Sequence, residues 1–154
     1  MVSSYQGRMQ APVRESYPNV GEFMSRSHVC VRPDTDIYKA VELIVKNSVS
    51  GACVTDEENN LLGIISEKDC LKLATQDAYE STPHGGPVSN YMTTDVMTLT
   101  PESGLHDTAE IFINNPYKKL PVLRDGKLVG VVRRHDVLAV IGDFYKKRMD
   151  YIRA

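Results

Sequence analysis

Hydrophobic and polar positions follow two kinds of pattern along the chain, and each kind predicts a different element. Apolar residues recur at spacings of 3, 4, 7 and 8 within 37–45 and again within 105–113, which is the pattern of one apolar helix face. Short apolar runs bounded by turn-forming residues predict strands. These runs are 51–55, 61–65, 119–123 and 128–132.

The two sets of elements arise from an internal repeat. Val20-Gly21-Glu22-Phe23-Met24 returns as Val88-Ser89-Asn90-Tyr91-Met92, an offset of 68 positions from Met24 to Met92. Pro33-Asp34 matches Pro101-Glu102 in the same register. The turn between the two predicted strands is one residue shorter in the second copy. A repeat of this length predicts two copies of one supersecondary unit.

Each copy is predicted to continue into a second helix, through 71–74 in the first copy and 137–141 in the second. Each copy is therefore a β-α-β-β-α unit, and the fold class is α/β (α+β). Neither copy has a sheet large enough to bury its own helices, so we expect the two to pack into one body.

The pattern also sets the expected boundaries. They are an arm at 1–18, the first copy at 19–75, a linker at 76–87, the second copy at 88–142 and a C-terminal helical extension at 143–154. The linker contains Ser81-Thr82-Pro83-His84-Gly85-Gly86, which is typical of an exposed connection. The arm has no clear period, and the sequence leaves open whether it is disordered or packs across the module.

Composition narrows the function classes. A chain of 154 residues with 42% hydrophobic residues is large enough for a core of its own. A net charge of -2 argues against nucleic acid or an anionic membrane surface as the main partner. No apolar run has the length of a signal peptide or of a membrane span, so we expect a cytoplasmic protein that does not enter membranes.

The cysteines fit that expectation. Cys30, Cys53 and Cys70 are odd in number and form no Cys-x-x-Cys pair. All three lie in apolar stretches, where cysteine usually behaves as a small buried hydrophobe. We therefore expect three core thiols in a reducing compartment.

No catalytic constellation stands out. The four histidines fall at unrelated spacings that do not place metal ligands on one face, so we expect no metal site. The Gly-x-Ser-x-Gly, Walker A and Gly-x-Gly-x-x-Gly patterns do not occur either. We expect that the chain is not an enzyme.

One motif in each copy resembles a known family. Gly63-Ile64-Ile65-Ser66-Glu67-Lys68-Asp69 and Gly130-Val131-Val132-Arg133-Arg134-His135-Asp136 are similar to the signature of cystathionine-β-synthase-type (CBS) repeats. The similarity runs from about Val20 to Ile141. Two such repeats form a Bateman module, so the resemblance implies two CBS repeats packed about a pseudo-twofold axis.

The resemblance also implies a function. CBS pairs bind adenosine-containing nucleotides in the clefts between their repeats and signal to a partner protein, so the expected ligand is AMP, ADP or ATP. The resemblance implies no cofactor. It does imply a homodimer formed through the helices. The alternative is a constitutive protein-interaction or oligomerisation module whose nucleotide sites are vestigial.

For the first cleft, the sequence points to Ser66 and Asp69, at the N-cap and N3 positions of the helix that follows. They are either a capping-box pair or a nucleotide site in which Asp69 accepts hydrogen bonds from ribose hydroxyls and the helix N-terminus faces phosphate. We expect Gly63 to let the ligand approach the strand. By resemblance, Thr98 approaches the adenine.

For the second cleft, Arg133 replaces the serine and cannot accept a hydrogen bond from helix amides. Asp136 keeps the N3 position, and by resemblance Cys30 faces this cleft. The other basic residues expected here are Lys118, Lys119, Arg134 and His135. They form either a solvated basic face or a phosphate site in which the Arg133 guanidinium binds phosphate oxygens. The sequence thus predicts a second cleft that is richer in cations than the first.

Overall fold

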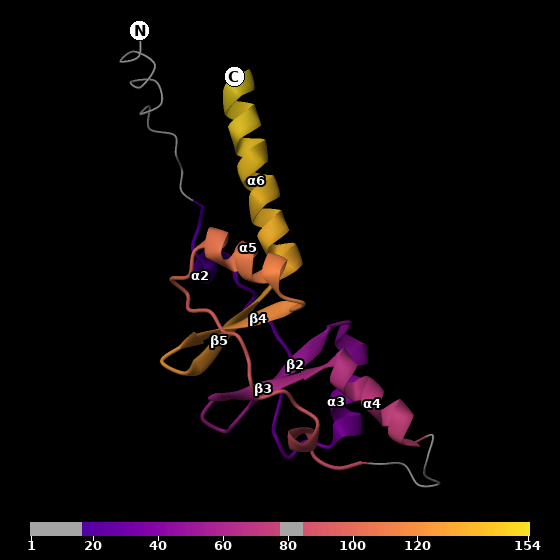
Figure 1. Ribbon diagram of the computed structural model, residues 1–154. Helices are drawn as coiled ribbons and strands as arrows, with labels where there is room; N and C mark the ends of the chain where they lie inside the picture. Colours follow the sequence, from indigo (N-terminus) through magenta and orange to yellow (C-terminus); the bar gives the residue numbers. More distant parts are fainter. Residues whose placement is uncertain (1–16, 78–84) are drawn as a thin grey trace.

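The computed structural model describes residues 17–77 and 85–154 (Figure 1). The first copy follows the predicted order of elements, and the second follows it from its first long helix onward. The first copy contains α2 (Val20–Phe23), β1 (Cys30–Val31), α3 (Ile37–Asn47), β2 (Gly51–Thr55), β3 (Leu61–Ser66) and α4 (Glu67–Asp77). The second contains η1 (Val88–Asn90), α5 (Leu105–Asn114), β4 (Lys119–Arg124), β5 (Lys127–Arg133) and α6 (Arg134–Arg153). The predicted α+β fold of two repeats is therefore confirmed.

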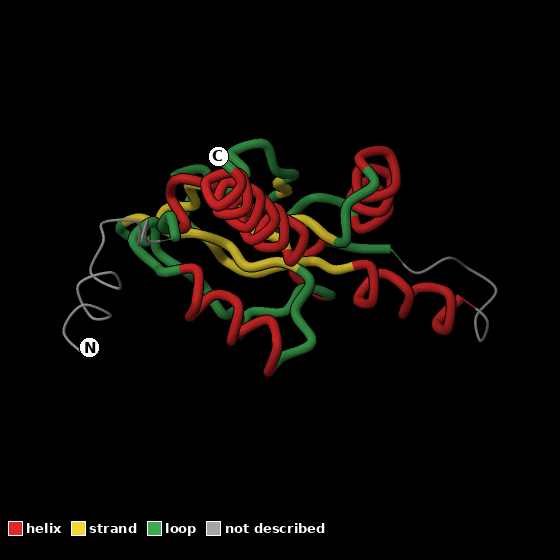
Figure 2. The backbone as a smooth tube through the Cα atoms, turned by 90° about the horizontal axis from the view of Figure 1, so that it is seen from above, coloured by secondary structure: helices red, strands yellow, loops and turns green. Residues whose placement is uncertain are grey.

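The strands form two small sheets. In the first copy β1 pairs parallel with β2, and β2 pairs antiparallel with β3. In the second copy β4 and β5 pair antiparallel, and the strand expected before α5 is reduced to a single parallel bridge between Leu99 and Val122. Figure 2 shows the strands as a central band with helices on either side.

Local sequence explains where the helices begin and end. The Asp36 side chain caps α3 by accepting a hydrogen bond from the Tyr38 amide at 2.9 Å. Ser48 ends the helix in the left-handed region, with φ 52°. Helix α6 runs unbroken to Arg153, so the expected C-terminal extension is the continuation of this helix beyond the sheet (Figure 1).

Each copy receives its opening segment from the other. Val20, in α2, is fully buried in the core of the second copy, and its amide donates to the Ser103 carbonyl at 2.9 Å. Val88, in η1, is fully buried in the core of the first copy, and its amide donates to the Thr35 carbonyl at 2.8 Å. The two copies are therefore interlocked through both cores.

This exchange explains the glycine of the repeated motif. A Cβ atom on Gly63 would lie 2.6 Å from the Thr93 carbonyl oxygen, and one on Gly130 would lie 2.6 Å from the Met24 sulfur. Backbone bonds between Ile64 and Thr93, both 2.9 Å long, hold the incoming segment at this distance. The expectation that Gly63 makes room for a ligand is wrong, because the space is taken by protein.

The cysteines differ from the prediction. Cys53 is a buried thiol, Cys70 is half-buried and Cys30 is exposed. Cys30 lies opposite Cys53 in the register of β1 and β2, and both thiols are free. β1 is the edge strand, and Cys30 lies outside the cluster of Leu128 and Val131 that buries Cys53.

Among the described helices, none is long and apolar enough to cross a bilayer.

Candidate functional site

Two cavities lie where the copies meet, with volumes of about 360 Å³ and 300 Å³. Most of their lining residues are related by the repeat. Ser66 in the first cavity corresponds to Arg133 in the second, and Tyr117 corresponds to Val49. Each cavity takes residues from both copies, so each depends on the packing of the whole module.

The polar wall of the first cavity is the junction between β3 and α4. The Ser66 amide donates to Asp69 Oδ2 at 3.0 Å, and the Asp69 amide donates to Ser66 Oγ at 3.1 Å. This is a capping box, and yet both side chains line the cavity. Asp69 Oδ1 takes no part in the capping bonds and lies 3.8 Å from Lys72 Nζ. Capping and ligand binding are therefore compatible at this carboxylate.

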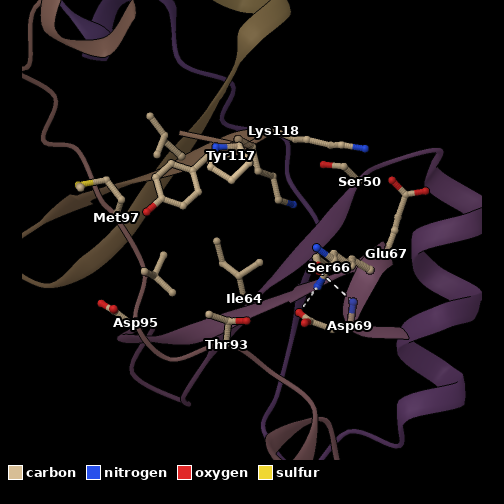
Figure 3. Close-up of a pocket in the computed structure, with 15 residues that line it drawn as sticks. Ser50, Ile64, Ser66, Glu67, Asp69, Thr93, Asp95, Met97, Tyr117 and Lys118 are labelled. Carbon is tan, nitrogen blue, oxygen red and sulfur yellow. Dashed lines mark hydrogen bonds between the residues drawn. The ribbon is translucent and has the colours of Figure 1, made fainter. Parts of the chain in front are cut away.

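An apolar wall faces this carboxylate. Met97, from the loop after η1, and Tyr117, from the loop before β4, lie across the cavity from Ser66 and Asp69, with Ile64 between them (Figure 3). An aromatic ring and a thioether offer a surface for a flat, apolar group. The cavity therefore combines an apolar surface with an anionic acceptor.

The lysines border both cavities. Lys118 and Lys119 line the first and the second, and the first cavity is also lined by Lys68. Lys119 Nζ donates to the Gly51 carbonyl, and burial lowers the pKa of this lysine. The prediction that these two lysines belong to the second cleft alone, leaving the first poor in cations, is wrong.

In the second cavity, Arg133 is already paired. Its Nη2 donates to Asp136 Oδ1 at 2.8 Å, its Nε donates to Oδ2 at 3.2 Å, and its backbone amide donates to Oδ2 at 2.8 Å. These contacts raise the pKa of Arg133. Two N–H groups of the guanidinium are therefore directed at the Asp136 carboxylate in the first turn of α6, and a phosphate would have to compete with this ion pair. Arg134 and His135 line the cavity beside it.

Three predicted residues do not line the cavity to which they were assigned. Thr98 and Cys30 are absent from both linings, whereas their neighbours Met97 and Val29 are present, and Asp136 does not line the second cavity. Side chains alternate in direction along extended segments, so a position carried over by resemblance fails when it is off by one residue.

Sequence reasoning missed Met97 and Tyr117. Tyr117 directly precedes the two lysines already singled out, and an aromatic residue at that point was the available signal. It also missed a group on α5, where donor atoms of His106, Asp107 and Glu110 lie within 4.8 Å of one another. All three side chains are exposed, and no ligand-directed feature accompanies them.

Comparison with known proteins gives matches over most of the chain. The CBS domain family model matches residues 20–75 and 88–143. CBSX1, a chloroplastic CBS domain-containing protein of Arabidopsis thaliana, is 32% identical over 81% of this chain and 64% of its own length. A protein of Methanocaldococcus jannaschii is 29% identical over 80% of this chain. The match spans 42% of that protein's own length.

Solved structures give the same result. The crystal structure of CBSX2 from Arabidopsis thaliana has a TM-score of 0.75 and 28% identity, covering 84% of this chain and 97% of that one. A structure of CBSX2 in complex with AMP has a TM-score of 0.74 and 29% identity, covering 83% of this chain and 98% of that one.

Proposed function

Because the chain belongs to the CBS domain family and carries two copies of the domain, we propose that it is a regulatory module that binds an adenosine-containing nucleotide in the first cavity. The observation that carries the proposal is the placement of the Asp69 carboxylate opposite the apolar wall of Tyr117 and Met97. A nucleoside matches such a cavity, because its base is flat and its ribose carries two adjacent hydroxyl donors.

The geometry suggests how AMP is held. The base lies against Tyr117 and Met97, and the ribose hydroxyls donate to Asp69 Oδ1, which the capping bonds leave available. The phosphate faces the N-terminal amides of α4 and the ammonium group of Lys118. The structure of CBSX2 with AMP supports AMP as the ligand to test first. ADP and ATP carry the same adenosine and are tested beside it.

Regulation follows from the position of the cavity. A ligand between the copies contacts both, so it favours the arrangement of the copies that it fits, and a partner protein can sense that arrangement. We also propose that the chain acts by binding a partner protein and that it is not an enzyme. Three free thiols are typical of a reducing compartment, and we propose a cytoplasmic location on this ground.

Repeat-related apolar residues support a homodimer. Val45 in α3 and its counterpart Ile113 in α5 are 71% and 79% exposed, and Leu71 in α4 and its counterpart Leu138 in α6 are 68% and 64% exposed. Each copy thus presents apolar side chains at the same two helical positions, as a self-complementary interface would. Light scattering at micromolar concentration tests this, and a mass of 17.2 kDa independent of concentration would contradict it.

Ligand binding is tested by calorimetric titration of AMP, ADP and ATP into the full chain, followed by thermal unfolding with each nucleotide. At a ligand concentration of 100 Kd, binding adds about 2.7 kcal/mol to the free energy of unfolding. Adenine, which lacks the ribose, is the matched control and should bind far more weakly than AMP. If no nucleotide binds at millimolar concentration, the cavities are vestigial and the module serves interaction alone.

A further inference from the structure

The two cavities correspond position by position, but they differ at the residue that would hold a ribose. Asp69 lines the first cavity, whereas its counterpart Asp136 does not line the second. The two carboxylates occupy the same place in the repeat, at N3 of the helix after the last strand, and each accepts a hydrogen bond from the backbone amide at the N-cap. Helix capping is therefore preserved in both copies, and access from the cavity is not.

The side chain at the N-cap accounts for the difference. In the first copy Ser66 has a short hydroxyl that accepts from the Asp69 amide and leaves Asp69 Oδ1 available. In the second copy the Arg133 guanidinium donates to both oxygens of Asp136, at 2.8 Å and 3.2 Å. Arg133 lines the cavity in place of the carboxylate that it covers. A carboxylate held by two guanidinium bonds has little remaining capacity to accept from a pair of hydroxyls.

The rest of the second cavity has the same layout with smaller side chains. Val29 stands where the first cavity has Met97, and Val49 stands where it has Tyr117. The volume is about 300 Å³ against 360 Å³ in the first. The apolar wall is reduced but not removed, so the covered carboxylate is the difference that most directly concerns recognition of a nucleoside.

We propose that Arg133 is a specificity-determining residue that closes the second cavity to nucleosides, so that each chain binds one nucleotide, in the first cavity. This inference rests on the proposed function, because it takes nucleotide binding at the Asp69 cavity as given. In this role Arg133 does not recruit phosphate. Its guanidinium instead occupies the Asp136 oxygens that would otherwise accept from ribose hydroxyls.

Calorimetric titration of AMP tests the proposal through the number of sites per chain. The wild type should bind one AMP per chain, and Arg133→Ser should bind two. A serine three positions before Asp136 would restore the arrangement of Ser66 and Asp69, including its capping box. The new site should be ~tenfold weaker than the first, since valine replaces the aromatic ring of the apolar wall. Affinity at the first site should be unchanged.

Arg134→Ser is the matched control, since it removes the same charge from the same cavity without touching Asp136, and it should leave one site. The double variant Asp69→Ala with Arg133→Ser should keep only the new site. Two sites in the wild type, or one site in Arg133→Ser, would overturn the proposal while leaving nucleotide binding intact. No AMP binding by either protein would instead overturn the proposed function and this inference with it.

Discussion

Replacing Asp69 with alanine separates the two roles that the structure allows this carboxylate, which are helix capping and ligand binding. The change removes the 3.0 Å hydrogen bond from the Ser66 amide to Oδ2. It also removes Oδ1, which the cap does not use, from a residue that lines the first cavity. Capping acts on the stability of the free protein, whereas an acceptor for ribose acts on affinity, so the two roles predict different measurements.

The expected magnitudes differ enough to be separated. Loss of one capping bond costs about 1 kcal/mol in the free energy of unfolding. For a domain of this size, that lowers Tm by roughly 2–4 °C. Loss of hydrogen bonds from ribose hydroxyls to a charged acceptor costs about 1.5–3 kcal/mol of binding, a roughly 10- to 150-fold weaker Kd for AMP.

The assay is thermal unfolding of the free protein combined with calorimetric titration of AMP. Asp136→Ala is the matched control, because Asp136 occupies the same position in the second copy and accepts the capping bond of α6 from the Arg133 amide at 2.8 Å. It does not line either cavity. We expect both variants to lose a few degrees of Tm and only Asp69→Ala to lose affinity. Equal AMP affinity in both variants and the wild type would show that Asp69 is a helix cap and nothing more.

Two further predictions concern the fold itself. Gly63→Ala should lower the free energy of unfolding by about 1–3 kcal/mol in urea, because its Cβ would lie 2.6 Å from a backbone oxygen, whereas Gly142→Ala in α6, with nothing within 4 Å, should raise it by about 0.5–1 kcal/mol. Equal effects of the two substitutions would contradict the close approach described for Gly63. Iodoacetamide at pH 8 should modify exposed Cys30 well before Cys53, whose pKa burial raises to about 11. Mass spectrometry of the native protein measures the order, and early labelling of Cys53 would show that the cluster around it does not exclude solvent.

Most of the secondary structure could be predicted from the sequence because its causes are local. The helical spacing in 37–45 and 105–113 and the apolar runs of the strands correspond to α3, α5 and the four main strands. The capping box of Ser66 and Asp69 also depends on residues three apart. The doubling of the pattern then indicated two copies of one unit, because neither copy can bury its own helices.

One feature of the site was local and was still missed. Arg133 and Asp136 are separated by three positions, the spacing at which side chains in the first turn of a helix meet. A count of the charges in the second cleft suggested that the Arg133 guanidinium could bind a ligand. In the structure this guanidinium donates two hydrogen bonds to Asp136. A list of charged residues does not show which charges are already paired.

The remaining features were decided by contacts between residues far apart in the chain. The sequence by itself determined the repeat, the main helices, the four longer strands and the pairing of Ser66 with Asp69, since these depend on periodicity and on neighbours within a few positions. Only the tertiary structure showed that Val20 and Val88 exchange cores, that Gly63 makes room for backbone, and that Tyr117 faces Asp69. The physical reason is that a cavity between two copies is lined by side chains whose direction depends on how the copies pack, and periodicity within one copy carries no information about that packing.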